Sequence, residues 1–204
     1  PTGGSAAGGA SGPNRKFDII GSNFGSSSIP NSFELFFKST TDDNDKTALL
    51  TQPSSTPSQC DSYDHKKLSG CKFPEGQGTN YVITVKVFGH PTQTFPVDVT
   101  NLINYEKPAL SSILPTSGGT KGGYTLTISG TNMGVVKPTV TFGGTIVAVA
   151  DQANGYHDSL TFPVPAGQGD SINIVVTAGG QVSNNIIFKY DAPTISSLSP
   201  TSSE

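Results

Sequence analysis

Short runs in which apolar and polar residues alternate dominate the second half of the chain. The run Tyr-Thr-Leu-Thr-Ile-Ser at 124–129 has a period of two, so Tyr124, Leu126 and Ile128 face one side of an extended segment and the hydroxyl residues face the other. Gly-Gly, Asn-Gly and proline signals separate such runs and predict strands at 109–114, 124–129, 138–142, 145–150, 158–162, 171–177 and 183–189. Short strands at this spacing predict an all-β fold, an antiparallel β-sandwich with few helices.

Glycine pairs give this sandwich its turns. Gly143-Gly144 lies between two predicted strands and predicts a two-residue hairpin of the primed type. The glycine-rich stretch at 115–134 does not fit a phosphate-binding loop, because Lys121 precedes Gly122 and a strand pattern follows instead of a helix. The predicted core consists of Leu126, Ile128, Val140, Phe142, Ile146, Ile172, Ile174, Val176, Ile186 and Phe188.

The chain repeats itself with a period of 85 residues. The segment "YEKPALSSILPTS" at 105–117 recurs as "YDAPTISSLSPTS" at 190–202. Two further pairs agree: "KFPEGQGTNYVITV" with "TFPVPAGQGDSINIVV", and "IIGSNFG" with "ISGTNMG". A fixed period of this length is typical of tandem small domains. We therefore predict one domain at 1–107, a second at 108–192, and the opening of a third unit at 193–204.

The phase of the repeat predicts an exchangeable strand. Residue 1 corresponds to about Pro115, so domain one is expected to lack the strand that domain two has at 109–114, while 193–199 is a spare copy of it. An open sheet edge can accept such a segment by backbone pairing. Either a second molecule donates it or a preceding repeat of a longer chain supplies it. Strand donation and the interdomain contact involve Tyr105, Pro108, Tyr190, Pro193, Ile195 and Leu198, with Ile195 and Leu198 as the anchors.

The two cysteines, Cys60 and Cys71, form neither a Cys-x-x-Cys motif nor a zinc pattern. A disulfide between them is predicted, which indicates an oxidising, extracellular setting; two reduced cysteines in a cytosolic protein are the alternative. The loop at 51–60 is rich in Pro, Ser and Thr and is expected to be exposed. The chain holds no basic-then-apolar leader and no apolar run of membrane-spanning length, so we expect a piece of a longer protein, attached to a membrane only through a segment outside it.

Catalytic chemistry finds little support. His65, His90 and His157 lie among polar neighbours and are interpreted as surface residues, and no nucleophile elbow accompanies them. The acidic run at 42–45 has oxygen ligands for calcium but lacks the glycine and distal glutamate of an EF-hand loop. With a net charge of −3, no basic face indicates nucleic acid. We expect no catalytic residue, no cofactor and no metal.

The second domain resembles the IPT/TIG family of immunoglobulin-like E-set domains. Three blocks carry the resemblance: "PALSSILPTSGGTKGGYTLTISGTNMG", "FPVPAGQGDSINIVV" and "GGQVSNNIIFKYDAP". Domain one departs from the pattern at both ends. The chain is most similar to the TIG repeats of social-amoeba surface proteins, and this resemblance implies adhesion and recognition at the cell surface.

These observations favour a non-enzymatic extracellular binding module whose partner is a protein, either a like or unlike surface protein or a neighbouring copy. The second hypothesis is a subunit of an extracellular filament assembled head to tail by donation of 193–199. A transcription-factor domain fits the family but not the charge or the predicted disulfide. A carbohydrate module is disfavoured because the chain has no Trp on which a sugar could stack.

Overall fold

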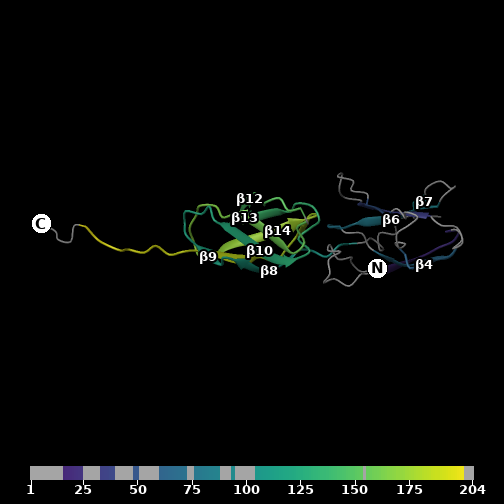
Figure 1. The fold of residues 1–204 in the computed structure, drawn as a ribbon, viewed down its shortest axis with the longest axis horizontal. Coiled ribbons are helices and arrows are strands. Elements are labelled where there is room, and N and C mark those ends of the chain that lie inside the picture. Colours follow the sequence, from purple (N-terminus) through teal and green to yellow (C-terminus); the bar gives the residue numbers. More distant parts are fainter. Residues whose placement is uncertain are drawn as a thin grey trace.

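The computed structural model describes residues 16–24, 33–39, 48–50, 60–72, 76–87, 93–94, 104–153 and 155–199. Two groups of strands follow one another along the long axis of the molecule, and a tail extends beyond the second group (Figure 1). Every regular element in the described ranges is a strand, which confirms the predicted fold class. We call the strands before residue 105 the N-terminal unit and those after it the C-terminal sandwich.

The N-terminal unit contains two sheets. The first has the order β1-β5-β4, with β1 at Lys16–Ile20, β5 at Lys67–Lys72 and β4 at Ser62–Tyr63. The second has the order β3-β2-β6-β7, with β3 at Ala48–Leu50, β2 at Phe33–Ser39, β6 at Tyr81–Val87 and β7 at Gln93–Thr94. All pairs in both sheets are antiparallel.

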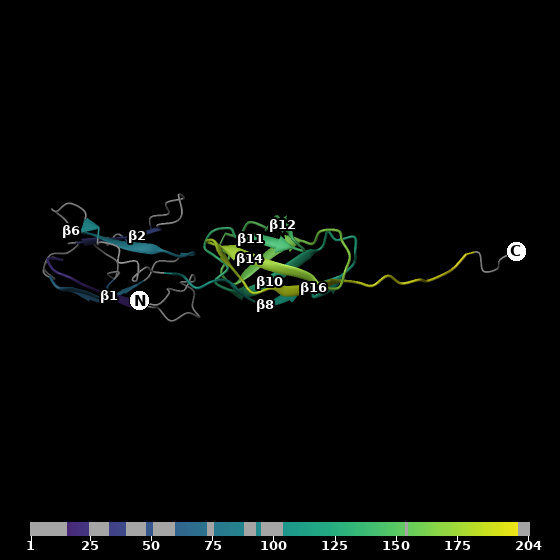
Figure 2. The same cartoon turned by 180° about the vertical axis from the view of Figure 1, so that it is seen from behind.

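The C-terminal sandwich also contains two sheets. One has the order β13-β10-β8, with β13 at Ser159–Pro163, β10 at Thr125–Thr131 and β8 at Ala109–Leu114. The other has the order β12-β11-β14-β16-β9, with β12 at Thr145–Val147, β11 at Thr139–Phe142, β14 at Ile172–Ala178, β16 at Ile186–Tyr190 and β9 at Ser117–Gly118. The short β15, at Gln181–Val182, pairs with β14. The two sheets lie face to face (Figure 2).

The core of the C-terminal sandwich lies between these sheets. Phe142 packs at its centre, with its ring centroid 5.9 Å from that of Phe162 and 5.5 Å from that of Phe188. Seven of the ten predicted core residues are buried: Leu126, Ile128, Val140, Phe142, Ile174, Val176 and Phe188. Ile172 and Ile186 are partly buried and pack against this cluster.

The prediction that Ile146 is a core residue is wrong, since its side chain is 71% exposed. The two-residue turn before it sets the register, in which Phe142 pairs with Thr145 and Val140 pairs with Val147. Because Val140 and Phe142 face the core and neighbouring residues along a strand face opposite ways, Ile146 faces outward.

Two predicted strands differ from the observed ones by three residues at one end. The strand expected at 145–150 ends at Val147, and the one expected at 183–189 begins at Ile186. The pattern did not predict β9 or β15, which have two residues each. β9 runs parallel to β16, so the sandwich is not antiparallel throughout.

The predicted turns are present. Gly143 and Gly144 have φ values of 56° and 87°, the positive pair that a primed two-residue hairpin requires. Gly122 and Gly123 also have positive φ, at 64° and 84°, which confirms that this glycine-rich stretch forms a turn before β10.

Candidate interaction site

The N-terminal unit meets the C-terminal sandwich at a hydrogen-bonded joint. On the N-terminal side, the segment Gly76-Gln77-Gly78 lies against Tyr105: the Tyr105 amide donates to the Gly78 carbonyl oxygen at 2.9 Å, and the Tyr81 hydroxyl donates to the Gln77 carbonyl oxygen at 2.7 Å. A Cβ on Gly76 would lie within 2.5 Å of the Tyr105 ring, so only glycine fits there. This arrangement directs the Gln77 side chain toward the C-terminal sandwich.

Two loops of the C-terminal sandwich receive this segment. The Val136 amide donates to Gln77 Oε1 at 3.2 Å, and Gln181 Nε2 donates to the Tyr105 carbonyl oxygen at 3.0 Å. Between these bonds the backbones touch, since a Cβ on Gly78 would lie 2.9 Å from the carbonyl oxygen of Gly179. Side-chain and backbone contacts together fix the orientation of one unit on the other.

Tyr105 lies at the centre of the joint with only 3% of its surface exposed. Its ring meets that of Tyr81 edge to face, with centroids 5.2 Å apart. Burial, with a smaller contribution from Tyr81, raises the pKa of the Tyr105 phenol well above its ordinary value. The phenol therefore stays neutral, as expected of a buried aromatic that stabilises packing.

The same arrangement recurs at the far end of the C-terminal sandwich. The Tyr190 amide donates to the Gly169 carbonyl oxygen at 2.8 Å, and a Cβ on Gly167 would lie 2.8 Å from the Tyr190 ring. The two Gly-Gln-Gly segments, at 76–78 and 167–169, differ in solvent exposure, however. Gly76 and Gly78 are buried at the joint, whereas Gly167, Gln168 and Gly169 are exposed.

The backbone bonding of β1 also has a counterpart, in β10. The Gly21 amide donates to the Lys66 carbonyl oxygen at 2.9 Å, and the Gly130 amide donates to that of Asp158 at 3.0 Å. Asn23 and Asn132 follow these glycines by two positions and are both left-handed, with φ values of 65° and 59°. β10 pairs with β13 on one side and with β8 on the other. In the described part of the chain, β1 pairs with β5 alone.

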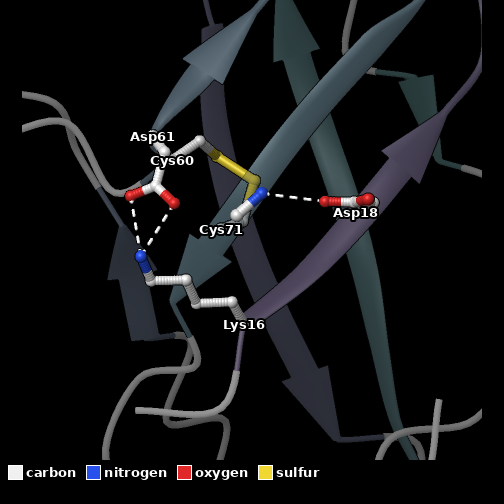
Figure 3. The surroundings of a disulfide bond; sticks show 6 residues. Lys16, Asp18, Cys60, Asp61 and Cys71 are labelled. Carbon is white, nitrogen blue, oxygen red and sulfur yellow. Dashed lines mark hydrogen bonds and ion pairs between the residues drawn. A yellow bond between two sulfur atoms is a disulfide. The ribbon is translucent and has the colours of Figure 1, made fainter.

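A disulfide joins Cys60 to Cys71 next to β1, as predicted (Figure 3). Both cysteines are fully buried. Cys71 lies in β5 and pairs with Phe17 of β1, so the disulfide anchors the strand that supports β1. It points toward an extracellular or cell-surface protein.

Charged groups surround the disulfide on the surface. Lys16 binds Asp61, with its Nζ 2.7 Å from Oδ2, and Lys67 binds Asp18 at 2.8 Å (Figure 3 shows the first pair). Hydrogen bonds from Lys67 and from the Gly70 amide lower the pKa of the Asp18 carboxyl. These groups are exposed, so each pair contributes little to stability.

The structure places the predicted site residues in two regions. Tyr105 and Pro108 are buried at and next to the joint, and Tyr190 occupies the equivalent position at the far end. The tail contains the other three: Pro193, Ile195 and Leu198 are all exposed. Sequence reasoning missed Gln77 and Gly179, although the repeat of Gly-Gln-Gly was a signal for the former.

Other candidate residues have varied outcomes. His65 is exposed, as expected, but His157 is partly buried and its Nδ1 lacks a hydrogen-bond partner in the described structure. His90, the acidic run at 42–45 and the loop at 51–59 lie outside the described residues. The described ranges contain no cluster of His, Cys, Asp or Glu suited to a metal ion. No helix within them has the length and apolarity needed to span a membrane.

Comparison with protein families identifies an IPT/TIG domain at residues 108–190. This match agrees with the immunoglobulin-like sandwich described above and fits a non-enzymatic binding module. No curated protein matches the chain.

Several solved structures are similar to parts of the chain. A putative phosphatase from Bacteroides thetaiotaomicron VPI-5482 is 27% identical over 42% of this chain and 18% of its own, with a TM-score of 0.33. The surface glycan-binding protein PbSGBP-B from Prevotella bryantii is 14% identical over 84% of this chain and 35% of its own (TM-score 0.45). The plexin A4 full extracellular region is 17% identical over 68% of this chain and 12% of its own, with a TM-score of 0.40. The chain spans only 18% of the phosphatase and 21% of each of two similar auxiliary nutrient-binding proteins, from Bacteroides ovatus ATCC 8483 and Bacteroides thetaiotaomicron VPI-5482.

Proposed function

We propose that this chain is part of a cell-surface adhesion or recognition protein, in which tandem immunoglobulin-like sandwiches present binding surfaces to other proteins. The joint at Gly78 and Gly179 carries this proposal. It holds one unit beyond the other, so that the described strands extend along one axis (Figure 1). Such spacing projects a distal module away from its attachment point, whereas a single-site enzyme has no need of it.

The tandem arrangement is itself part of the proposal, with domains at 1–107 and 108–192 and a further unit opening at 193–204. Its support is the recurrence of specific geometry: the tyrosine on the Gly-Gln-Gly segment, and the left-handed asparagine that follows β1 in one unit and β10 in the other. The IPT/TIG match at 108–190 supports the second domain.

The disulfide supports an extracellular location, because reducing compartments do not maintain such bonds in ordinary proteins. The partner is a protein, met either as a second copy of this molecule or as an unlike surface protein. A membrane is involved only through a segment outside this chain.

Bead adhesion tests this function. Beads carrying the chain through a C-terminal tag should adhere to beads carrying the same chain or to intact cells of the source organism, more than albumin-coated beads do. The double variant Ile195→Asp/Leu198→Asp runs in parallel, so that adhesion through the tail is separated from adhesion through the sandwich faces. Failure of wild-type beads to adhere to either surface contradicts the proposal.

A further inference from the structure

β1 has the position in its sheet that β10 has in the other, but among the described strands it has one neighbour instead of two. β10 pairs with β8 from Thr127 to Thr131, on the side away from β13. At the corresponding stretch from Asp18 to Ser22, no described strand pairs with β1 on the side away from β5. The edge therefore presents backbone donors and acceptors where the C-terminal sandwich has a complete ladder.

The segment that would complete this ladder is present in the tail. Residues 193–199 repeat the pattern of β8, with Ile195 in place of Leu110 and Leu198 in place of Ile113. In β8 these side chains are only 8% and 5% exposed, whereas Ile195 is 90% and Leu198 76% exposed. Two large apolar side chains at core spacing lie in solvent, and burying them is favourable.

The tail cannot reach β1 of its own molecule in this arrangement. It leaves the far end of the C-terminal sandwich and points away from the N-terminal unit in both views (Figures 1 and 2). The whole sandwich separates it from β1. Pairing of this segment with β1 therefore requires a second molecule.

The end of the C-terminal sandwich beside the tail has an exposed surface that a second molecule could cover. Its Gly-Gln-Gly segment, Gly167 to Gly169, is exposed, while the same segment at 76–78 is covered by the next unit in the chain. Tyr190 holds it in the conformation that Tyr105 imposes at the joint. An N-terminal unit placed beyond this end would cover the segment, as the C-terminal sandwich covers residues 76–78.

We infer that residues 193–199 of one copy pair with β1 of a second copy, antiparallel and in the register of β8 on β10. This register places Leu198 opposite Ile19, Ser197 opposite Ile20 and Ile195 opposite Gly21. A Cβ on Gly130 would lie 3.1 Å from the Cα of Leu110, whereas a Cβ on Gly21 would lie 2.6 Å from the Phe24 ring.

The resulting contact is heterologous: the tail end of each copy binds the β1 end of the next. Because the two surfaces lie at opposite ends of the molecule, the contact does not close into a dimer and instead extends as a head-to-tail row. This inference concerns self-association and does not depend on the adhesion role.

Disulfide trapping in the full chain tests the register. One sample carries Ile20→Cys and the other Ser197→Cys, both outward-facing positions that the proposed register places opposite each other. Mixed under mild oxidation, they should form a crosslinked heterodimer. The matched control pairs Ile20→Cys with Thr194→Cys, which lies three residues further along the strand, about 10 Å away, and should crosslink at least tenfold less.

Sedimentation equilibrium of the wild-type chain provides the second measurement. The average mass should rise with concentration, Ile195→Asp/Leu198→Asp should remain monomeric, and Thr194→Asp, at an exposed position of the β8 pattern, should associate nearly as wild type does. A wild-type chain that remains monomeric at every concentration, or equal crosslinking by the two cysteine pairs, overturns the inference. In that outcome, a preceding repeat of a longer chain is the source of the strand. Bead adhesion by the double variant is a separate result, so the two proposals fail independently.

Discussion

Gly78 and Gly179 touch backbone to backbone across the joint, and neither has room for a side chain. Gly78 has a φ of 94° and Gly179 a φ of 56°, and a Cβ on Gly179 would lie 2.6 Å from the Cα of Gly78. The neighbouring Gly180 also has positive φ, at 76°, but nothing lies within 4 Å of a Cβ there. Gly179 and Gly180 thus differ in contact with the N-terminal unit while both have positive φ.

This pair allows a controlled test of the joint. Gly179→Ala should separate the two units, because the added methyl group displaces Gly78, whereas Gly180→Ala should only weaken the turn by about 1 kcal/mol. ¹⁵N relaxation should give the same rotational correlation time for both units in wild type and in Gly180→Ala. In Gly179→Ala the two units should have different, shorter correlation times. Equal behaviour of the two variants would argue against a joint held by this contact.

The Gln77 side chain should stabilise the joint between the two units, whereas the Gln168 side chain should have no effect on it. Gln77→Ala removes the acceptor of the partly buried Val136 amide and should cost about 1–3 kcal/mol of coupling between the units. Gln168→Ala is the matched control, since the same residue of the repeated segment is exposed. Hydrogen exchange at Val136 should accelerate in the first variant alone; acceleration in neither would contradict the assigned bond.

The raised pKa of Tyr105 predicts the response of the joint to alkali. Because the fold raises the phenol pKa above its unfolded value of about 10, its stabilisation is fully present below pH 10 and is lost as pH rises through the folded pKa. Absorbance titration of the tyrosinates should therefore show a late group that is missing in Tyr105→Phe. Burial also raises the pKa of Tyr190, which makes this difference between variants the informative quantity. A titration that Tyr105→Phe leaves unchanged would count against burial of the phenol.

The disulfide should stabilise only the N-terminal unit. Closing a loop of this size contributes about 3 kcal/mol in the chain-entropy model, so Cys60→Ser/Cys71→Ser should lower the stability of β5 and β1 by roughly that amount. Hydrogen exchange resolved by strand should show faster opening in β5 and unchanged protection in β14. Equal loss in both strands would mean that the two units unfold as one.

Truncation of Ile174 and of Ile146 should change the free energy of unfolding by very different amounts. Ile174 is fully buried in β14 and Ile146 is 71% exposed in β12. Replacement by Ala should lower the free energy of unfolding by about 2–5 kcal/mol at Ile174 and by no more than about 0.5 kcal/mol at Ile146. Denaturant titration of both variants measures the difference, and similar losses would refute the register of β12.

Alternation along the chain predicted most of the C-terminal sandwich because its strands each have one buried face. It failed at Ile146, where the two-residue turn decides the register and apolar character alone does not. It also missed β9 and β15, which are too short to show any period and which tertiary packing places beside β16 and β14.

The candidate site was harder to predict than the fold. The repeat identified Tyr105 and Tyr190 as equivalent. Whether the end of the unit at each tyrosine contacts another unit depends on tertiary packing, which the local sequence pattern does not show. Gly78 and Gly179 are distant in the sequence, and their contact follows from how a turn of one unit meets a loop of the other. The cysteines needed no such information, because the chain contains only two.

Small-angle X-ray scattering over a concentration series tests the central claim most directly, namely that the sandwiches join end to end within and between molecules. The Ile195→Asp/Leu198→Asp chain should give an elongated particle with two lobes at every concentration. The wild-type chain should lengthen with concentration while its cross-section stays constant. A compact single lobe for the variant, or growth of the wild type in cross-section instead of length, would contradict the account.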